Sequence, residues 1–260
     1  MIEFTPFSPV FLTIGELKFH YYGLMYALSF LIIYFSLPFV FRWRDIILNK
    51  KAYEELFFKT ALSGLLGGRL FYILFYNLAY YLENPLKILA VWEGGMASHG
   101  GFIGALLGGF WVCRQYQLKF LKIADAVVIL LGIGLALGRL GNFINGELYG
   151  AITTVSWCVN FETIEGCRHP TQIYAMLKDF SLFILMFSLV KTKWREGSLV
   201  LVFFFCYSFL RFFVESFREP YFEIGVFSLT LFPGQVFSLV VMFFCLVMGG
   251  VWIFKDGFKN

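Results

Sequence analysis

The chain has 260 residues, of which 59% are hydrophobic and only 15% are charged, and its mean hydropathy is +0.75. A soluble domain carries about 25% charged residues, so this composition excludes an ordinary soluble protein and predicts an integral membrane protein. The net charge of +4 comes from scattered Lys and Arg residues, whereas a nucleic-acid-binding protein gathers them into a basic patch. We therefore expect a membrane partner and no nucleic acid.

Seven apolar stretches recur along the chain, and a helix that crosses the hydrocarbon needs about 20 apolar residues. We place the spans at 19–41, 56–79, 97–113, 123–142, 172–190, 198–217 and 229–254. The lead before them, residues 1–17, has no Lys or Arg, so it lacks the basic start of a cleavable signal peptide. The predicted fold class is an all-α polytopic membrane protein with about seven transmembrane helices, forming a single membrane-embedded domain over 1–260.

Glycines recur every four residues in two of these spans, at Gly100, Gly104 and Gly108 in the third and at Gly134 and Gly138 in the fourth. Small residues at this spacing let helix backbones approach closely in lipid. We therefore expect both spans to pack tightly against neighbouring helices, and packing alone accounts for most of these glycines.

Lys and Arg residues are concentrated in alternate connections, and such connections face the cytoplasm. The first, third and fifth connections and the tail hold Arg42, Arg44, Lys50, Lys51, Arg114, Lys119, Lys122, Lys191, Lys193, Arg195, Lys255 and Lys259. The other side has only Lys18, Lys87, Arg168 and Arg218 over longer stretches. This asymmetry predicts an N-terminus outside, a C-terminus in the cytoplasm, and an outside head segment over about 142–171.

Polar side chains inside the spans lie at one depth. An ionisable group near mid-bilayer costs roughly 2.5–3.5 kcal/mol on insertion scales, and such groups usually mark function. In the predicted orientation the outer half of the bilayer holds Tyr22, Arg69, His99, Arg139, Asn142, Arg211, Glu215 and Gln235. Random placement would scatter these residues over both halves, so their convergence predicts a site in the outer half.

The sixth span carries Tyr207, Arg211, Glu215 and Arg218 at spacings of four, four and three, which puts them on one helical face. A self-neutralising Arg–Glu pair is the simpler interpretation, but it explains neither Arg218 nor Arg139 at the same depth. A guanidinium is a planar, charged fork that binds phosphate oxygens in pairs. These residues therefore favour a phosphate ligand, and a phospholipid headgroup is the phosphate at this depth.

His99 and the cysteines offer further chemistry. His99 lies among glycines, and its imidazole could take a proton from a thiol or serve only as a helix cap or hydrogen-bonding group. Cys158 and Cys167 both fall in the outside segment, where an oxidising exterior makes a disulfide between them plausible. No cysteine or histidine spacing is typical of a zinc site, and no nucleotide-binding loop occurs, so we expect neither metal nor cofactor.

Several motifs occur in a fixed order along nearly the whole chain. They are YGLMY at 22–26, LGGR at 66–69, HGG at 99–101, GRLGNFINGELYG at 138–150, HPTQIY at 169–174, the Tyr207–Arg218 stripe and Gly234-Gln235. The 138–150 stretch resembles the signature of the prolipoprotein diacylglyceryl transferase family. Two positions depart from that family's usual pattern, since Ala151 stands where Arg is frequent and Ala175 where Glu is frequent.

The resemblance implies a seven-span protein of the bacterial inner membrane with a site open to lipid and to the periplasm. It implies that phosphatidylglycerol donates a diacylglyceryl group to the lipobox cysteine of a prolipoprotein signal peptide, giving a thioether and glycerol phosphate. By position, the family's functional residues correspond to Tyr22, His99, Arg139, Asn142, Glu147, Gly150, Arg211 and Glu215.

We assign catalytic roles to His99, Arg139, Glu147, Arg211 and Glu215. Arg139 and Arg211 would bind the phosphodiester and its developing charge. His99 is the preferred base, with Glu147 or Glu215 as alternatives, and Glu215 would also orient its arginine neighbours. The expected substrate-binding residues are Tyr22, Arg69, Asn142, Gly150, Tyr207, Arg218 and Gln235.

A transporter or flippase for an anionic lipid or solute is the alternative from another functional class, because it too would place arginines in a cavity. A carrier should have charged groups near the midplane or on both sides of the membrane. The polar side chains predicted here lie at a single depth in the membrane, and this favours the transferase.

Overall fold

The computed structural model describes residues 2–7, 10–15, 17–162, 164–219, 224–226 and 229–257. The predicted tail charge Lys259 lies outside these residues. The chain divides into two compact units, which are described separately. The first unit comprises residues 1–45 and 124–260, and the second comprises residues 46–123. Whether they make a single membrane domain stays a prediction.

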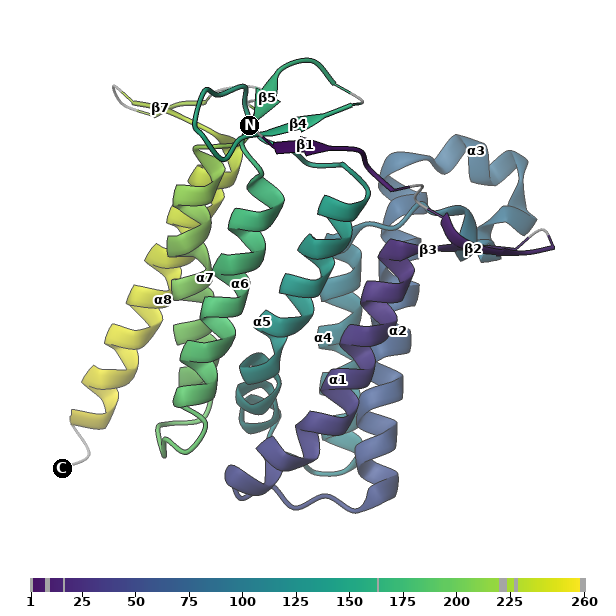
Figure 1. Ribbon diagram of the computed structural model, residues 1–260. Coiled ribbons are helices and arrows are strands. Elements are labelled where there is room, and N and C mark those ends of the chain that lie inside the picture. Colours follow the sequence, from purple (N-terminus) through teal and green to yellow (C-terminus); the bar gives the residue numbers. More distant parts are fainter. Residues whose placement is uncertain are drawn as a thin grey trace. The chain divides into compact units, whose positions relative to one another are not determined.

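The first unit is built from long helices (Figure 1). They are α1 (Tyr21–Trp43), α5 (Phe120–Ile144, whose first residues belong to the second unit), α6 (Thr171–Ser188), α7 (Ser198–Glu215) and α8 (Pro233–Gly257). Helix α7 lies between α6 and α8 and packs against both. The fourth- and sixth-span predictions agree with α5 and α7 to within a few residues.

Short strands correct the expectation of an all-α fold, because the chain is mostly rather than wholly helical. Strand β1 (Ile2–Phe4) pairs in parallel with β4 (Val159–Phe161), which pairs antiparallel with β5 (Cys167–Arg168). Two antiparallel hairpins are β2 (Val10–Ile14) with β3 (Leu17–His20) and β6 (Ile224–Val226) with β7 (Leu229–Leu231). Helix α8 therefore starts four residues later than predicted, at Pro233, where proline suits the first helical turn.

Strands β4 and β5 lie in the 142–171 segment that was predicted to be a head, and β1 joins them from the start of the chain. Cys158 and Cys167 are joined by a disulfide with a Cα–Cα distance of 5.5 Å, which confirms the predicted pairing. The bond links the residue before β4 to the first residue of β5. It thus links the two antiparallel strands covalently.

The second unit is dominated by α2 (Lys50–Tyr76) and α4 (Ser98–Gln115), with α3 (Leu78–Glu83) and the 3₁₀ turns η1 (Pro85–Leu89) and η2 (Val91–Glu93) between them. Asn49 caps α2 by accepting a hydrogen bond from the Ala52 amide at 2.8 Å. A Cβ on Gly104 would collide with the Ser63 carbonyl of α2 and come within 3.1 Å of the Gly67 Cα. The predicted close approach is confirmed for the third span.

The glycines of the fourth span behave differently. A Cβ on Gly134 would make ordinary contact with α1, 3.5 Å from Ile33 Cδ1, and one on Gly138 would meet no described atom within 4 Å. The expectation of tight packing at both positions was therefore wrong, because four-residue spacing alone does not say whether another backbone lies opposite. Gly132 is the tight position of α5, where a Cβ would lie 2.6 Å from the Asp179 carbonyl oxygen of α6.

Four described helices are long and apolar enough to cross a membrane, judged by length and composition: Tyr21–Trp43, Phe120–Ile144, Ser198–Glu215 and Pro233–Trp252. The other three long helices, α2, α4 and α6, coincide with predicted spans but contain more polar or small residues. Examples are Arg69 in α2, His99 in α4 and Lys178 in α6.

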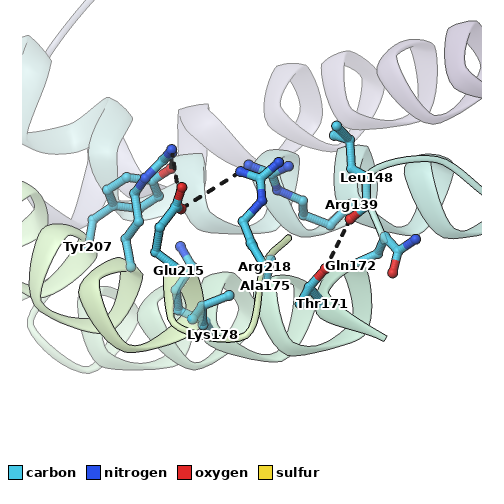
Figure 2. A pocket seen from close by; sticks show the side chains of 11 residues that line it. Arg139, Leu148, Thr171, Gln172, Ala175, Lys178, Tyr207, Glu215 and Arg218 are labelled. Carbon is cyan, nitrogen blue, oxygen red and sulfur yellow. Dashed lines mark hydrogen bonds and ion pairs between the residues drawn. The ribbon is translucent and has the colours of Figure 1, made fainter. Parts of the chain in front are cut away.

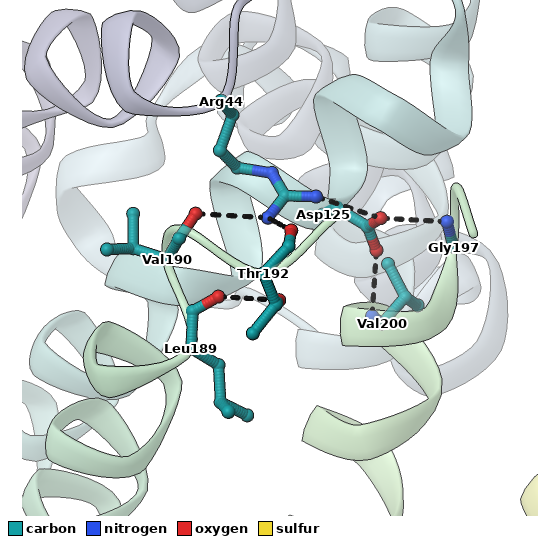
Figure 3. A network of polar contacts seen from close by, with 7 residues as sticks. All are labelled: Arg44, Asp125, Leu189, Val190, Thr192, Gly197 and Val200. Atoms are coloured by element: carbon teal, nitrogen blue, oxygen red, sulfur yellow. Dashed lines mark hydrogen bonds and ion pairs between the residues drawn. The ribbon is translucent and has the colours of Figure 1, made fainter. Parts of the chain in front are cut away.

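At the opposite end of the first unit from the sheet, one buried carboxylate ties four helix ends together (Figure 3). Asp125, which is 0% exposed, accepts hydrogen bonds from the amides of Gly197 (2.8 Å) and Val200 (3.0 Å) at the start of α7. Arg44, just after α1, lies 3.6 Å from the same carboxylate and donates to the Val190 carbonyl oxygen after α6 at 3.2 Å. One of the arginines that indicated the cytoplasmic side is therefore a structural residue.

Candidate active site

A pocket opens between α5, α6 and α7 within the first unit, and basic side chains dominate its polar lining (Figure 2). Its empty volume is about 390 Å³, including the part that is open to the outside. The lining residues are Arg139, Leu148, Thr171, Gln172, Ala175, Lys178, Tyr207, Arg211, Val214, Glu215 and Arg218. We call this the arginine pocket.

The stripe predicted on the sixth span faces this pocket as a unit. The Glu215 Oε2 atom lies 3.7 Å from Arg211 Nη2 and also 3.7 Å from Arg218 Nη1, and Arg211 Nη1 donates to the Tyr207 hydroxyl at 3.3 Å. Figure 2 shows the carboxylate between the Tyr207 end of the pocket and Arg218. One carboxylate therefore orients two guanidiniums, as the spacing predicted.

Two arginines keep donors that the protein does not use. Arg139 reaches the pocket from α5 (Figure 2), and no carboxylate among the described residues forms an ion pair with it. The Arg211 Nε is buried without a hydrogen-bond partner in the described part of the chain. A buried polar group without a partner costs about 1–3 kcal/mol, so an anion that accepted these hydrogen bonds would relieve that cost.

The loop after α5 is fixed by hydrogen bonds from its own helix and from α6. The Asn142 amide donates to Glu147 Oε1 at 2.8 Å, Gln172 donates to the Glu147 carbonyl oxygen at 2.7 Å, and Thr171 donates to the Leu148 carbonyl oxygen at 2.9 Å. Gln172 is 2% exposed, so this contact is shielded from water. The 169–174 motif thus serves as a scaffold that sets where the 138–150 motif ends.

Gly150 joins the ends of α6 and α7. Its amide donates to the His169 carbonyl oxygen at 2.9 Å, and it forms an isolated bridge with Arg218. A Cβ here would lie 2.7 Å from Thr171 Cγ2, so only glycine fits without displacement. His169 Nδ1 and the Tyr174 hydroxyl are 3.1 Å apart, and burial lowers the pKa of this histidine.

Tyr22 and Gln235 lie in the same unit but do not line the arginine pocket. The Tyr22 hydroxyl is 3.0 Å from that of Tyr26, and its ring packs beside Gly141 of α5. Gln235 donates to Ser216 Oγ at 3.0 Å and accepts from the Phe232 amide at 3.0 Å. Gln235 therefore couples α8 to the end of α7, behind the stripe.

Arg69, in the second unit, is a clamp for the chain between α2 and α4. It is 4% exposed, and its guanidinium donates to the carbonyl oxygens of Lys87 (2.5 Å) and Ile88 (3.0 Å) and also to that of Gly94. Gly95 has a φ of 77°, and a Cβ there would lie 2.8 Å from Arg69 Nη1. Each of the three guanidinium nitrogens of Arg69 has a carbonyl partner, which argues for a structural rather than a phosphate-binding role of this arginine.

His99 occupies the first turn of α4, also in the second unit, and its side chain is exposed. The imidazole lies near Phe71 of α2, with 6.3 Å between ring centroids. The exposure of the ring agrees with what the surrounding glycines predicted. Its place relative to the arginine pocket stays part of the proposal below.

Four residues of α6 were not singled out from the sequence as part of the site: Thr171, Gln172, Lys178 and Asp179. The first three line the pocket, and Asp179 pairs with Lys178. Lys178 and Asp179 gave a usable signal, because a Lys-Asp pair interrupts an otherwise apolar span.

Comparison with known proteins agrees with these motifs over nearly the full chain. Residues 9–251 match the family model described as prolipoprotein diacylglyceryl transferase. Three relatives carry the name phosphatidylglycerol–prolipoprotein diacylglyceryl transferase. The Geobacter sulfurreducens protein is 42% identical over 95% of this chain and 96% of its own length. The Desulfotalea psychrophila protein is 38% identical over 90% and 89%, and a Legionella pneumophila protein is 34% identical over 97% and 98%. The chain therefore belongs to the prolipoprotein diacylglyceryl transferase family.

Proposed function

We propose that this protein transfers the diacylglyceryl group of phosphatidylglycerol to the lipobox cysteine of a prolipoprotein. The observation that carries the proposal is the arginine pocket, which is lined by Arg139, Arg211 and Arg218 and by a single carboxylate, that of Glu215, which pairs with Arg211 and Arg218. Such a pocket holds more positive than negative charge and retains unused guanidinium donors. A phosphodiester fits both features, because guanidinium binds phosphate oxygens through paired hydrogen bonds.

The reaction exchanges one bond at a glycerol carbon of the donor. The cysteine sulfur, as thiolate, attacks the carbon that bears the phosphate ester, and a carbon–sulfur bond forms. The carbon–oxygen bond to phosphate breaks, and glycerol phosphate leaves with the electron pair. Arg139 and Arg211 stabilise the charge that grows on the departing phosphate. The nucleophile belongs to the substrate, so the mechanism needs no cysteine of the enzyme.

His99 remains the preferred base for the thiol proton. Its imidazole is exposed, and histidine is the side chain most often used as a general base in proton transfer. The two alternatives are already engaged, since Glu215 orients two guanidiniums and Glu147 accepts from Asn142. Glu147, together with Asn142, thus serves mainly to hold the 138–150 motif beside the pocket. Tyr22 lies at the same end of α5 and would contact the headgroup.

The membrane arrangement we propose has seven spans, with the N-terminus outside and the arginine pocket in the outer half of the inner membrane. The Lys and Arg asymmetry supports this orientation, and so does the disulfide in the 142–171 segment, because disulfides persist outside the cytoplasm. Reporter tags after Asn49 and after Lys193 should be cytoplasmic, and a tag after Gly166 should be periplasmic. The opposite pattern would move the pocket to the inner leaflet.

The deciding experiment is mass spectrometry of a lipobox peptide incubated with phosphatidylglycerol and the purified protein. A diacylglyceryl adduct on the cysteine, with release of glycerol phosphate, is the expected product. A serine-for-cysteine peptide is the matched control and should stay unmodified. Absence of the adduct with a folded protein would refute the proposal. Family membership favours the transferase, and we do not retain the transporter alternative.

A further inference from the structure

Helix α6 buries an ion pair that the proposed reaction does not use. Lys178 is 8% exposed and Asp179 is 1% exposed, and the Lys178 ammonium pairs with the Asp179 carboxylate. Gly132 of α5 lets that helix pack directly onto the backbone of Asp179, so the pair is well shielded. Adjacent charges within a span are costly, and such residues usually mark function.

Lys178 is also in contact with the stripe on α7. Its Nζ lies 3.8 Å from the centroid of the Tyr207 ring, a distance at which a cation is attracted to the ring face. The Tyr207 hydroxyl in turn accepts a hydrogen bond from Arg211 Nη1 at 3.3 Å. A continuous chain of contacts therefore runs from the α6 ion pair through Tyr207 to the guanidinium in the arginine pocket.

Among the described residues, the Lys178 ammonium has two partners, the Asp179 carboxylate and the Tyr207 ring. Ala175, one helical turn earlier on the same face, also lines the pocket. A carboxylate at that position could pair with Lys178 in the i, i+3 arrangement. With alanine there, the cation stays on Asp179 and the Tyr207 ring.

We propose that Lys178 is a positioning residue, which holds the Tyr207 ring so that its hydroxyl orients Arg211 toward the phosphate. This role rests on the proposed transferase function. Direct binding of substrate is the poorer interpretation, because the Lys178 side chain is 6% exposed and its ammonium would have to leave both partners. A desolvated cation–ring contact is strong enough to change a rate about 30-fold when it is lost.

The test removes both charges, because Lys178→Met alone would leave Asp179 buried without its partner. Replacing a buried ion pair by neutral residues of similar volume is usually tolerated. Lys178→Met with Asp179→Asn should elute as the parent does and should form adduct with a kcat about 30-fold lower and a nearly unchanged KM for phosphatidylglycerol. Lys178→Arg, which keeps a cation against the ring and the carboxylate, should retain near-parental kcat.

A double-mutant cycle that combines the charge-free pair with Tyr207→Leu shows whether Lys178 acts through the Tyr207 ring or independently of it. If Lys178 acts through the ring, removing the charge pair in the Tyr207→Leu background should cost no further turnover. Full additivity would overturn the proposal, as would a raised KM with unchanged kcat. Parental kcat in the folded charge-free variant would also overturn it.

Folding and the reaction itself are controlled separately. A second charge-free pair, Lys178→Leu with Asp179→Asn, is measured in the same way, and failure of both pairs to fold would assign Lys178 to the fold and overturn the positioning role. Failure of the proposed function gives a different result, because the parent protein would then form no adduct at all.

Discussion

Arg211→Lys should leave the protein folded and the pocket charged, yet remove most of its turnover. Arg211 spreads its donors over three directions: Nη1 lies 3.3 Å from the Tyr207 hydroxyl, Nη2 lies 3.7 Å from Glu215, and Nε is buried without a partner in the described chain. Lysine has one nitrogen and can occupy only one of these positions. Losing one charge-assisted donor in a water-excluded site costs about 2.7–4 kcal/mol, or roughly 100- to 1,000-fold in rate.

Arg211→Ala should be more severe, because Glu215 then keeps only Arg218 as a partner. The Arg211 side chain is 30% exposed, so the cost to folding should stay below the roughly 3–5 kcal/mol of a fully buried broken pair. Phosphatidylglycerol should still bind both variants through Arg139, more weakly than the parent. We therefore expect kcat to fall more than KM rises in the lysine variant.

The assay is adduct formation per minute by detergent-purified variants that elute as the parent does. Arg42→Lys is a matched control, since Arg42 is exposed in the last turn of α1, outside the pocket, and its turnover should be parental. Near-parental turnover by Arg211→Lys would exclude a forked contact from the mechanism. Near-parental turnover by Arg211→Ala would remove the residue from the site altogether.

Three further predictions concern stability and are read from thermal unfolding in detergent. Gly104→Ala should destabilise the protein by about 1–3 kcal/mol, because the new methyl group overlaps the backbone of α2. Gly101→Ala is the control, since its Cβ would make only a 3.6 Å contact. Equal unfolding midpoints for the two variants would contradict the close packing of α4 on α2. Asp125→Asn should cost about 3 kcal/mol by breaking the buried ion pair of Asp125 with Arg44 beside the amides that begin α7, and an unchanged midpoint would show that this carboxylate does not stabilise the fold. Replacing Cys158 and Cys167 by alanine should cost about 2–3 kcal/mol, and rapid alkylation of both thiols in the folded parent would contradict the disulfide.

The helices could be predicted because each long apolar run is a local signal. The bounds of α5 and α7 differ from prediction by only a few residues. The strands could not be predicted in this way, because β1 pairs with β4, with Ile2 opposite Val159. No local periodicity in the sequence indicates a pairing between segments so far apart. The start of the last span was predicted four residues too early for a related reason. Leu229–Leu231 continues the apolar run of α8 in the sequence, yet it forms strand β7 and pairs with β6.

The helical part of the stripe, Tyr207, Arg211 and Glu215, could be predicted, since i and i+4 positions on a helix share a face. Arg218 lies three residues beyond the end of α7, in a bridge with Gly150, and still pairs with Glu215. Contributions from other helices depend on which faces meet, and the sequence does not contain that information directly. Lys178 and Gln172 were missed for this reason, although both line the same pocket as Arg211. Gln235 shows the converse case, where a polar residue at the expected depth holds two helices together.

Arg69 and Arg139 show why polarity within a span does not by itself identify a ligand-binding arginine. Both lie within long helices, and both were expected to contact substrate. The chain after α2 turns back through 3₁₀ segments and positive-φ glycines, so that five carbonyl oxygens meet the Arg69 guanidinium. Arg139 has no comparable set of acceptors among the described residues, and it faces a pocket. The acceptors that the local backbone supplies decide whether a buried guanidinium holds the fold or remains available to bind an anion.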